Sequence, residues 1–407
     1  MTTQPKQERL AGPDRHEVTG VRVYTRSPIT LPWLATTVAP VVHDLRADGS
    51  AALHLRRGWL HGPHVDIVAR GAAGGAPSWA AVAGRLDAGP LTPGDALDEQ
   101  TYLAQARESG RMEAVPAPYL PLADHGQVDF LTGDDVDPVG GALHGLREQA
   151  TVNAALCTPL VATIEELAHE PTDGPVRLVE AFAALADSYF LGLGHGVFSF
   201  RSHAEAFFAW AAPTRDLRPV FAARLAAESS RLRPVVEQRL SGDTSALAAG
   251  WRTAFAYAGG ALDGAVVHGA LTVDMLNAVN ATVDTTTMGP PAAPRTVPRG
   301  SSPDTDFHRT VLASGAIDDP PPFFAAYRVL LNLFYQQLPL LTVSPMQRYY
   351  TCFAVAELVD EVLGESWSDR LGRTQVRRVG SAPTPASDPA PPAPASAPVR
   401  HLEGALR

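Results

Sequence analysis

Lysine is almost absent from this chain of 407 residues. It occurs once, at Lys6 in the N-terminal stretch, and every other strongly basic side chain is arginine. Schiff bases, pyridoxal phosphate anchors, phosphate-binding P-loops and Ser-x-x-Lys nucleophiles all need a positioned lysine. The composition therefore argues against ATP-driven and pyridoxal phosphate chemistry.

Cysteine and long apolar runs are also scarce. Cys157 and Cys352 stand far apart and supply neither a disulfide framework nor a cysteine-rich zinc site, so a reducing cytoplasm is the simplest location. No run approaches the roughly 18 apolar residues of a membrane span, and the polar N-terminus shows no secretory signal. The net charge of −10 argues against binding to nucleic-acid phosphates. We expect neither nucleic acid nor membrane as a partner.

The N-terminal third carries strand patterns. Alternating apolar and polar residues predict strands at 18–26, 51–56 and 65–70, and the last two form a hairpin around a Gly- and Pro-containing loop. A helix is expected near residues 79–86 and one further strand within 119–130. Residues 1–17 are expected to be disordered.

Helical periodicity dominates from about residue 145. Helices are predicted at 150–169, 176–190, 217–240, 244–257 and 344–363, with an apolar segment at 323–341 and a kink or break at Pro234. Residues 284–306 form a long polar loop, and the Pro/Ala-rich residues 380–407 are expected to be disordered. The fold class is α+β, with N-terminal antiparallel strands packed against a helix-rich remainder. One region is expected over 18–372, strand-rich at 18–140 and helix-rich at 145–372.

Metal and nucleotide motifs are incomplete. His203 and Glu205 form the His-x-Glu of zinc deaminases, but no Cys-x-x-Cys pair completes the site. The three histidines near the hairpin loop, at positions 54, 61 and 64, are more simply solvated or packed against rings than bound to metal. The glycines at 192–196 lack the spacing and the βαβ context of a dinucleotide loop. We expect no metal and no cofactor.

The segment FSFRSHAEAF at 198–207 admits two interpretations. Ser202 can cap a helix that starts here, with Glu205 at the capping-box position. The functional interpretation adds Arg201 and His203 as exposed groups beside this helix N-terminus. There they could hold a carboxylate or a polarised amide carbonyl.

The segment LPLLTVSPMQRYYTCFAVAELVDEVL at 338–363 carries the strongest local pattern. Ser344 and Gln347 form a capping box with Pro345 at the first helical position, which explains Ser344 without a catalytic role. Tyr350 follows Ser344 by roughly 9 Å along the helix axis, and its side chain leans back toward the N-terminus. Two hydroxyls at the mouth of one helix could hydrogen-bond a neutral, amide-like substrate.

Three segments together resemble a known family. LPLLTVSPMQRYY at 338–350, FSFRSHAEAF at 198–207 and LRRGWLHGPHVDIVAR at 55–70 are similar to the thiopeptide pyridine synthases. These enzymes are relatives of the elimination domain of class I lanthipeptide dehydratases. The likeness covers residues 18–372 and implies an elimination-domain-like fold.

The resemblance implies a formal aza-[4+2] cycloaddition. Two dehydroalanines of a precursor peptide, with a leader and an azole-bearing core, would join into a pyridine-centred macrocycle with loss of water and leader. Ser344 and Tyr350 are carried over as catalytic residues. We expect Arg201, His203, Glu205 and Tyr349 to contact the substrate. The reaction needs proximity, polar donors and mild acid–base groups, and no cofactor.

Two alternatives stay open at this stage. A split elimination enzyme would remove glutamate from glutamylated Ser or Thr, but Asp66 in the strand after the Gly-Pro-His turn would repel the glutamyl carboxylate. A non-catalytic subunit that binds the leader peptide would also suit a helical lobe with an apolar groove. The sequence leaves a homodimer open as well.

Overall fold

The structure is a computed structural model. It describes residues 18–50, 52–69, 77–91, 94, 96–113, 115–132, 148–212, 215–272, 274, 304–315 and 322–380. The prediction of disorder at 1–17, the prediction of disorder at 380–407 except for Gly380, and nearly all of the predicted loop at 284–306 lie outside the described residues. Gly380 is helical, so the prediction of disorder is wrong at this residue.

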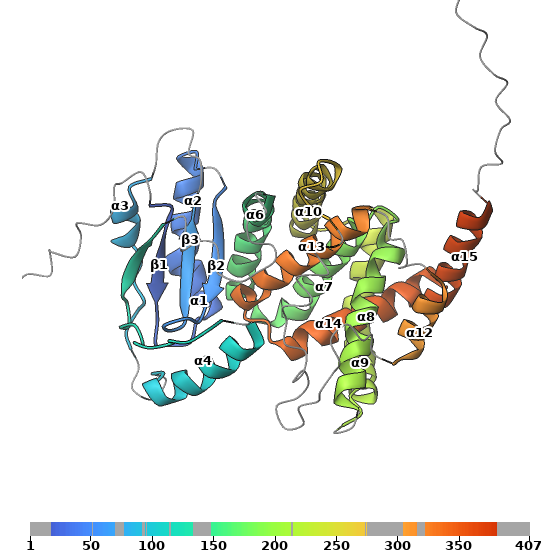
Figure 1. The fold of residues 1–407 in the computed structure, drawn as a ribbon, viewed down its shortest axis with the longest axis horizontal. Helices are drawn as coiled ribbons and strands as arrows, with labels where there is room; N and C mark the ends of the chain where they lie inside the picture. The colour runs from blue at the N-terminus through green and yellow to red at the C-terminus, as the bar shows by residue number, and fades with distance from the viewer. Residues whose placement is uncertain are drawn as a thin grey trace, which may run out of the picture.

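A four-stranded antiparallel sheet forms the N-terminal part (Figure 1). Its strands are β1 (Gly20–Tyr24), β2 (His54–Gly58), β3 (His64–Val68) and β4 (Val128–Leu131), in the order β2-β3-β1-β4. The predicted hairpin is confirmed, because His54 pairs with Val68 and Gly58 with His64. Strand alternation places Val21, Val23 and Ile67 in the fully buried core.

The face opposite this apolar one carries a row of charges. The register aligns Arg56, Asp66, Arg22 and Asp129 across the four strands. Asp66 is 1% exposed, and it accepts hydrogen bonds from Arg22 Nε at 2.8 Å and from Arg56 Nη2 at 2.8 Å. Because Arg22 and Arg56 balance the charge of Asp66, the sheet tolerates this buried carboxylate.

Short helices surround the sheet. α1 (Leu31–Trp33) continues through a π-helical turn into α2 (Ala39–Ala47), which lies behind the strands, and α4 (Glu99–Glu113) lies below them in Figure 1. The helix predicted near 79–86 is α3 (Trp79–Ala83). The sequence patterns did not predict α1, α2 or α4.

The remainder is helical, which confirms the α+β class. Its helices are α6 (Glu148–His169), α7 (Gly174–Asp187), α8 (Leu193–Ala211), α9 (Arg218–Ser241), α10 (Ala246–Val267), α12 (Asp306–Ala313), α13 (Pro322–Gln337), α14 (Pro345–Leu363) and α15 (Trp367–Gly380), with a 3₁₀ turn, η5, at Leu338–Leu341. α7 is the central helix and packs against α8, α9, α10 and α14. Among the described residues, no helix has both the length and the apolarity needed to cross a bilayer.

Two expectations about these helices are wrong. α8 begins at Leu193, after Gly192 in a positive-φ conformation, so Ser202 lies inside the helix and does not cap it. The second is a break at Pro234, because α9 continues through this residue, whereas the alternative of a kink there stays a prediction. Pro234 is exposed, so water can reach the carbonyl group that the proline leaves without its helical hydrogen bond.

Candidate active site at the start of α14

Ser344 begins the candidate site as the N-cap of α14. Its Oγ accepts a hydrogen bond from Gln347 N at 3.2 Å, and the Gln347 side chain accepts one from Ser344 N at 2.8 Å. This capping box is the one predicted from the sequence. Ser344 is exposed, and its hydroxyl proton can still be donated to a ligand.

Tyr350 lies almost two turns further along the helix. Its hydroxyl donates to Glu228 Oε2 on α9 at 2.7 Å, and Arg224 Nε donates to the other oxygen of Glu228 at 3.0 Å. The Arg224 guanidinium also lies 3.9 Å from the centre of the Tyr350 ring. Burial and the neighbouring Glu228 carboxylate raise the pKa of Tyr350, so the phenol keeps its proton at neutral pH.

A pocket of about 160 Å³ lies beside these groups. Tyr350, Thr351 and Gln347 of α14 line it together with Arg224 of α9 and Thr342. Apolar side chains from α1, α6, α7 and α9 complete its wall: Leu31, Leu167, Leu178, Val179 and Leu232. Pockets for drug-sized ligands are roughly 300–1,000 Å³, so this one suits a single residue of a larger substrate.

An aromatic cluster adjoins the start of α14 on its α8 side. His203 Nδ1 lies 3.0 Å from the Tyr335 hydroxyl, which is also 3.2 Å from Cys352 Sγ. Tyr349 stacks on Phe207 with ring centres 4.4 Å apart. Burial, with the nearby charges of Arg348 and Arg328, lowers the pKa of His203 to about 3, so this imidazole is neutral.

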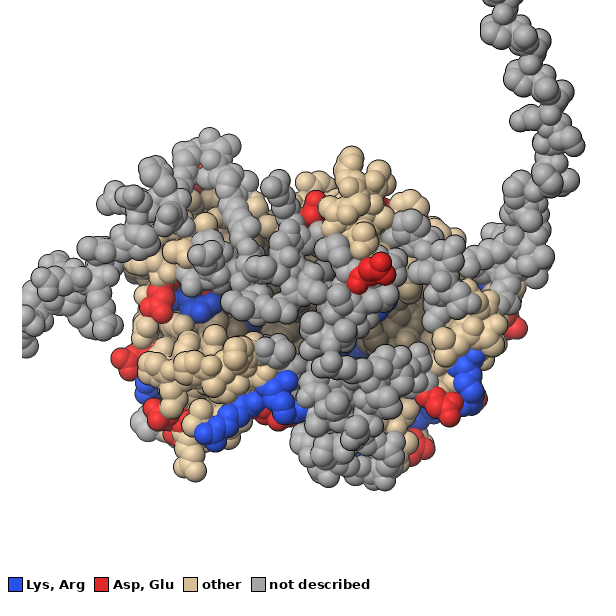
Figure 2. All heavy atoms as spheres, in the orientation of Figure 1, with Lys and Arg blue, Asp and Glu red and all other residues tan. Residues whose placement is uncertain are grey.

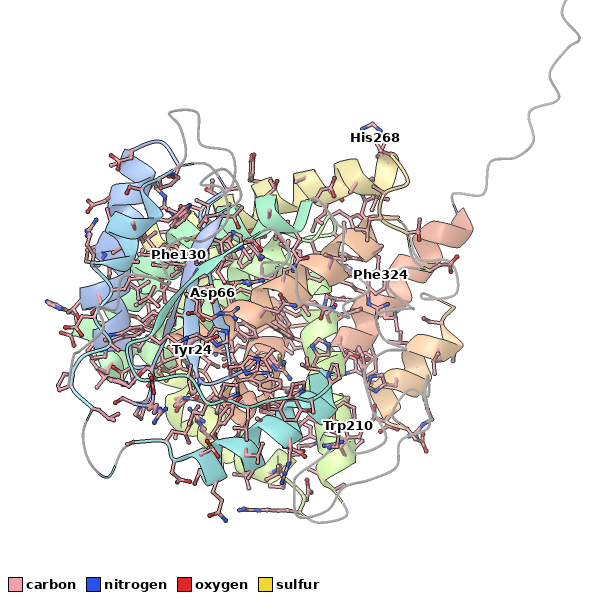
Figure 3. The ribbon with its side chains drawn as sticks, turned by 60° about the vertical axis from the view of Figure 1, so that its left-hand side comes forward. Tyr24, Asp66, Phe130, Trp210, His268 and Phe324 are labelled. Carbon is pink, nitrogen blue, oxygen red and sulfur yellow. The ribbon has the colours of Figure 1, made fainter. Side chains whose placement is uncertain are left out.

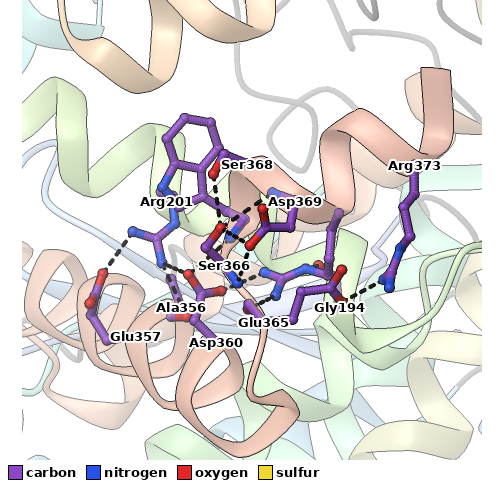
Figure 4. Close-up of polar contacts among 12 residues, drawn as sticks. Gly194, Arg201, Ala356, Glu357, Asp360, Glu365, Ser366, Ser368, Asp369 and Arg373 are labelled. Atoms are coloured by element: carbon purple, nitrogen blue, oxygen red, sulfur yellow. Dashed lines mark hydrogen bonds and ion pairs between the residues drawn. The ribbon is translucent and has the colours of Figure 1, made fainter. Parts of the chain in front are cut away.

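Arg201 is buried, contrary to the prediction that it is exposed beside a helix N-terminus. It lies in the middle of α8, where Nη1 donates to Glu357 at 2.7 Å and Nη2 donates to Asp360 at 2.8 Å (Figure 4). Asp360 also pairs with Arg370 of α15. These contacts tie α8 to the C-terminal half of α14 and give Arg201 a structural explanation.

Glu205 likewise has a partner within the protein, since Arg218 holds both of its oxygens, at 2.9 and 2.6 Å. His203 is also mid-helix and not beside a helix N-terminus. Substrate contact by Arg201, His203, Glu205 and Tyr349 stays a prediction, as do the catalytic roles of Ser344 and Tyr350.

Asp66 bears on the elimination alternative. Its carboxylate is buried between Arg22 and Arg56, so it is not a free charge that would repel a glutamyl group. Figure 3 shows Asp66 on the sheet, apart from Phe324 on α13 and Trp210 on α8. The sequence argument against elimination therefore loses its basis.

Metal ligation finds no support in the described residues, where no three His, Cys, Asp or Glu side chains gather to hold an ion. His54 Nδ1 and His64 Nδ1 each lie within 3.0 Å of a backbone carbonyl oxygen, of Ala52 and Gly62 respectively. Burial, with the Arg22 charge, lowers the pKa of His64 to about 4.

The sequence reasoning missed Glu228, Arg224, Arg348 and Tyr335. The spacing of four residues between Arg224 and Glu228 is a recognisable helical ion pair. Nothing in the sequence, however, connects this pair to Tyr350, which lies 122 positions beyond Glu228.

Solved structures share this fold over nearly their whole length, although no family model and no curated protein matches the chain. One is the pyridine synthase TbtD from thiomuracin biosynthesis, with a TM-score of 0.58 and 18% identity over 86% of this chain and 99% of that chain. Another is TsrL, with a TM-score of 0.54 and 17% identity over 87% of this chain and 97% of that chain. The chain therefore has the fold of a pyridine synthase.

Proposed function

We propose that this protein is a pyridine synthase of thiopeptide biosynthesis. It joins two dehydroalanines of a modified precursor peptide by a formal aza-[4+2] cycloaddition, and loss of water and leader peptide leaves a pyridine-centred macrocycle. The observation that carries this proposal is the fold shared with TbtD over 99% of that chain. Tyr350 beside a residue-sized pocket supports it.

Tyr350 acts on the backbone amide that must become an iminol before it reacts. Its hydroxyl donates to Glu228, so its oxygen can accept the amide N–H while its own proton passes to the carboxylate. The amide loses one proton and Glu228 gains one. A donor at the amide oxygen, the role proposed for Ser344, stabilises the charge that develops there until that oxygen is protonated.

Proximity supplies most of the remaining acceleration. Holding two reactants in a reactive geometry can contribute roughly 7–11 kcal/mol. The pocket beside Tyr350 fixes one dehydroalanine, and the peptide folds back to bring the second against it. A precursor peptide is therefore both substrate and partner.

The test uses purified protein with a dehydrated, azole-bearing linear peptide and mass spectrometry of macrocycle and released leader. We expect turnover by the native protein and a loss of about 10²-fold or more in Tyr350→Phe, since general acid–base groups typically contribute 10²–10⁴-fold. Glu228→Gln retains the shape of the partner but loses its basicity, so it should fall by a similar factor.

Tyr257→Phe is the matched control, because Tyr257 on α10 is 66% exposed and lies outside this pocket. It should turn over at the native rate. Unchanged turnover in Tyr350→Phe would remove Tyr350 from the mechanism. Glutamate release from a glutamylated peptide would identify an elimination enzyme, and binding of linear peptide without conversion would identify a leader-binding subunit.

A further inference from the structure

Two arginines of the helical part lack an acidic partner. Arg328 on α13 and Arg348 on α14 are both half-buried, yet within the described ranges no carboxylate lies at ion-pair distance from either. In the same helical part, Arg201 on α8 and Arg218 on α9 each hold at least one carboxylate. A guanidinium taken out of water without a partner is costly, so this pair requires an explanation.

Arg348 is fixed between two aromatic rings. Its guanidinium carbon lies 4.9 Å from the centre of the Tyr335 ring and 4.6 Å from that of Tyr349, and Tyr349 is stacked on Phe207. Contacts with ring faces partly offset the lost hydration, but they supply no negative charge to balance the guanidinium. Arg348 Nε is buried and has no hydrogen-bond partner.

The two arginines act on the same crevice. Arg348 lies over the ring of Tyr335, whose hydroxyl contacts His203. Arg328 lies two turns before Tyr335 on the same face of α13. In agreement with this placement, the charges of both arginines contribute to the lowered pKa of His203. Half-buried residues follow each other at helical spacing along α8 and α13: Ser199, Ser202, His203, Phe207 and Trp210 on α8, and Phe324, Arg328, Asn332 and Tyr335 on α13. Figure 2 shows this face of the molecule, with α12 at its right-hand side.

We propose that this crevice binds a carboxylate of the peptide substrate, with Arg348 as the main donor and Arg328 as a second cation. A planar guanidinium matches a carboxylate with two parallel hydrogen bonds. The aromatic side chains beside Arg348 suit the azole or aromatic groups of a modified peptide. The inference rests on the proposed function only in taking the substrate to be a peptide.

Two sources of this carboxylate fit the chemistry equally: the C-terminus of the core peptide and a glutamyl group on its side chains. Binding is therefore measured by calorimetry with three forms of one dehydrated linear peptide, namely the C-terminal acid, the C-terminal amide, and the amide bearing one glutamyl ester. We expect at least one carboxylate form to bind about tenfold more tightly than the plain amide, as for a charged hydrogen bond.

Arg348→Gln should abolish this preference, and Arg328→Gln should reduce it. Arg348→Lys keeps the positive charge but cannot form the two parallel hydrogen bonds of a guanidinium, so it should retain part of the preference. Arg233→Gln is the matched control, because Arg233 is about half exposed and pairs with Glu237 and Glu361. Retained melting temperatures in Arg348→Lys and Arg328→Gln keep the test valid if Arg348→Gln fails to fold.

Equal binding of all three peptides by the native protein would overturn the proposal, and so would equal losses for acid and amide in the arginine variants. A preference for the acid form assigns the C-terminus, and a preference for the glutamyl form assigns the side chain. Because binding is measured without turnover, a carboxylate preference in a protein that makes no macrocycle would support this inference while refuting the proposed function.

Discussion

The two halves of α14 differ in how far their charged side chains are paired. In the C-terminal half, Glu357 and Asp360 form ion pairs with Arg201 (Figure 4). Asp360 also pairs with Arg370, which is nearly fully buried. Arg370 donates further to the carbonyl oxygens of Gly194 and Glu365. Most strong donors in this half therefore have an acceptor within the protein.

In the N-terminal half of α14, fewer of the polar and charged side chains have partners within the described part of the protein. Arg348 has no acidic partner in the described part of the chain, Ser344 is exposed, and Tyr350 lines a pocket. The same helix thus has one half that holds the fold together and one half that has hydrogen-bonding capacity left for a ligand. We therefore expect substitutions in the C-terminal half to change stability and substitutions in the N-terminal half to change binding.

The largest effect is expected where the paired half is broken. Asp360→Asn leaves the buried Arg201 and Arg370 short of one negative charge between them. Removing one partner from a buried ion pair typically costs about 3–5 kcal/mol, so the free energy of unfolding should fall by that amount in chemical denaturation. Activity per folded molecule should change little, because Asp360 does not line the pocket.

Glu361→Gln provides the contrast for this variant. Glu361 is the next residue, and its partner Arg233 is about half exposed, as is Glu361 itself. Exposed ion pairs contribute about 0–1 kcal/mol to stability, so Glu361→Gln should lower the free energy of unfolding by an amount within that range. If Asp360→Asn and Glu361→Gln lower the free energy of unfolding by the same amount, the C-terminal half of α14 is not a stabilising network.

An intermediate effect is expected from protonation near the N-terminal half. The pKa of His203 is lowered to about 3 from the usual 6.5, so below pH 6.5 the unfolded chain binds a proton that the folded chain does not. Stability is therefore complete above pH 6.5 and falls as the pH drops toward 3, by up to about 1.4 kcal/mol per unit.

Urea denaturation at pH 7, 6 and 5 measures this slope, and His203→Asn should reduce it over the same interval. The comparison is between slopes, so any constant loss of stability in the variant does not affect it. An identical slope in both proteins would mean that the pKa of His203 is not lowered in the folded protein, which would contradict both its burial and the effect of the nearby arginine charges.

The sequence predicted elements best where a local rule acts alone. Ser344, Pro345 and Gln347 fixed the start of α14 through the capping box. Ser202 and Glu205 carry a similar pattern but do not start a helix. The Ser202 hydroxyl contacts His308, 106 positions away, and the Glu205 carboxylate accepts a hydrogen bond from Arg218. Long-range partners thus replaced the local cap, and a local pattern contains no information about them.

The candidate site was predicted only in part for the same reason. Ser344 and Tyr350 lie on one helix, so helical geometry could bring them near each other. Glu228 on α9 and Tyr335 on α13 reach α14 only through tertiary packing. The buried state of Arg201 also depends on distant residues, Glu357 and Asp360, and its short-range pattern wrongly indicated an exposed side chain.

The smallest stability effect is expected at Ser344, where a matched pair of variants separates the cap from the chemistry. Ser344→Ala removes the N-cap acceptor and should cost about 1 kcal/mol in unfolding free energy. Ser344→Asp keeps an acceptor for Gln347 N, so its stability should stay close to that of the native protein, but its ionised side chain has no proton to donate. If the hydroxyl donates to the substrate amide, macrocycle formation falls in both variants although only one is less stable. If formation falls only in Ser344→Ala, Ser344 acts through the helix alone, and Tyr350 with Glu228 must account for the chemistry at this end of α14.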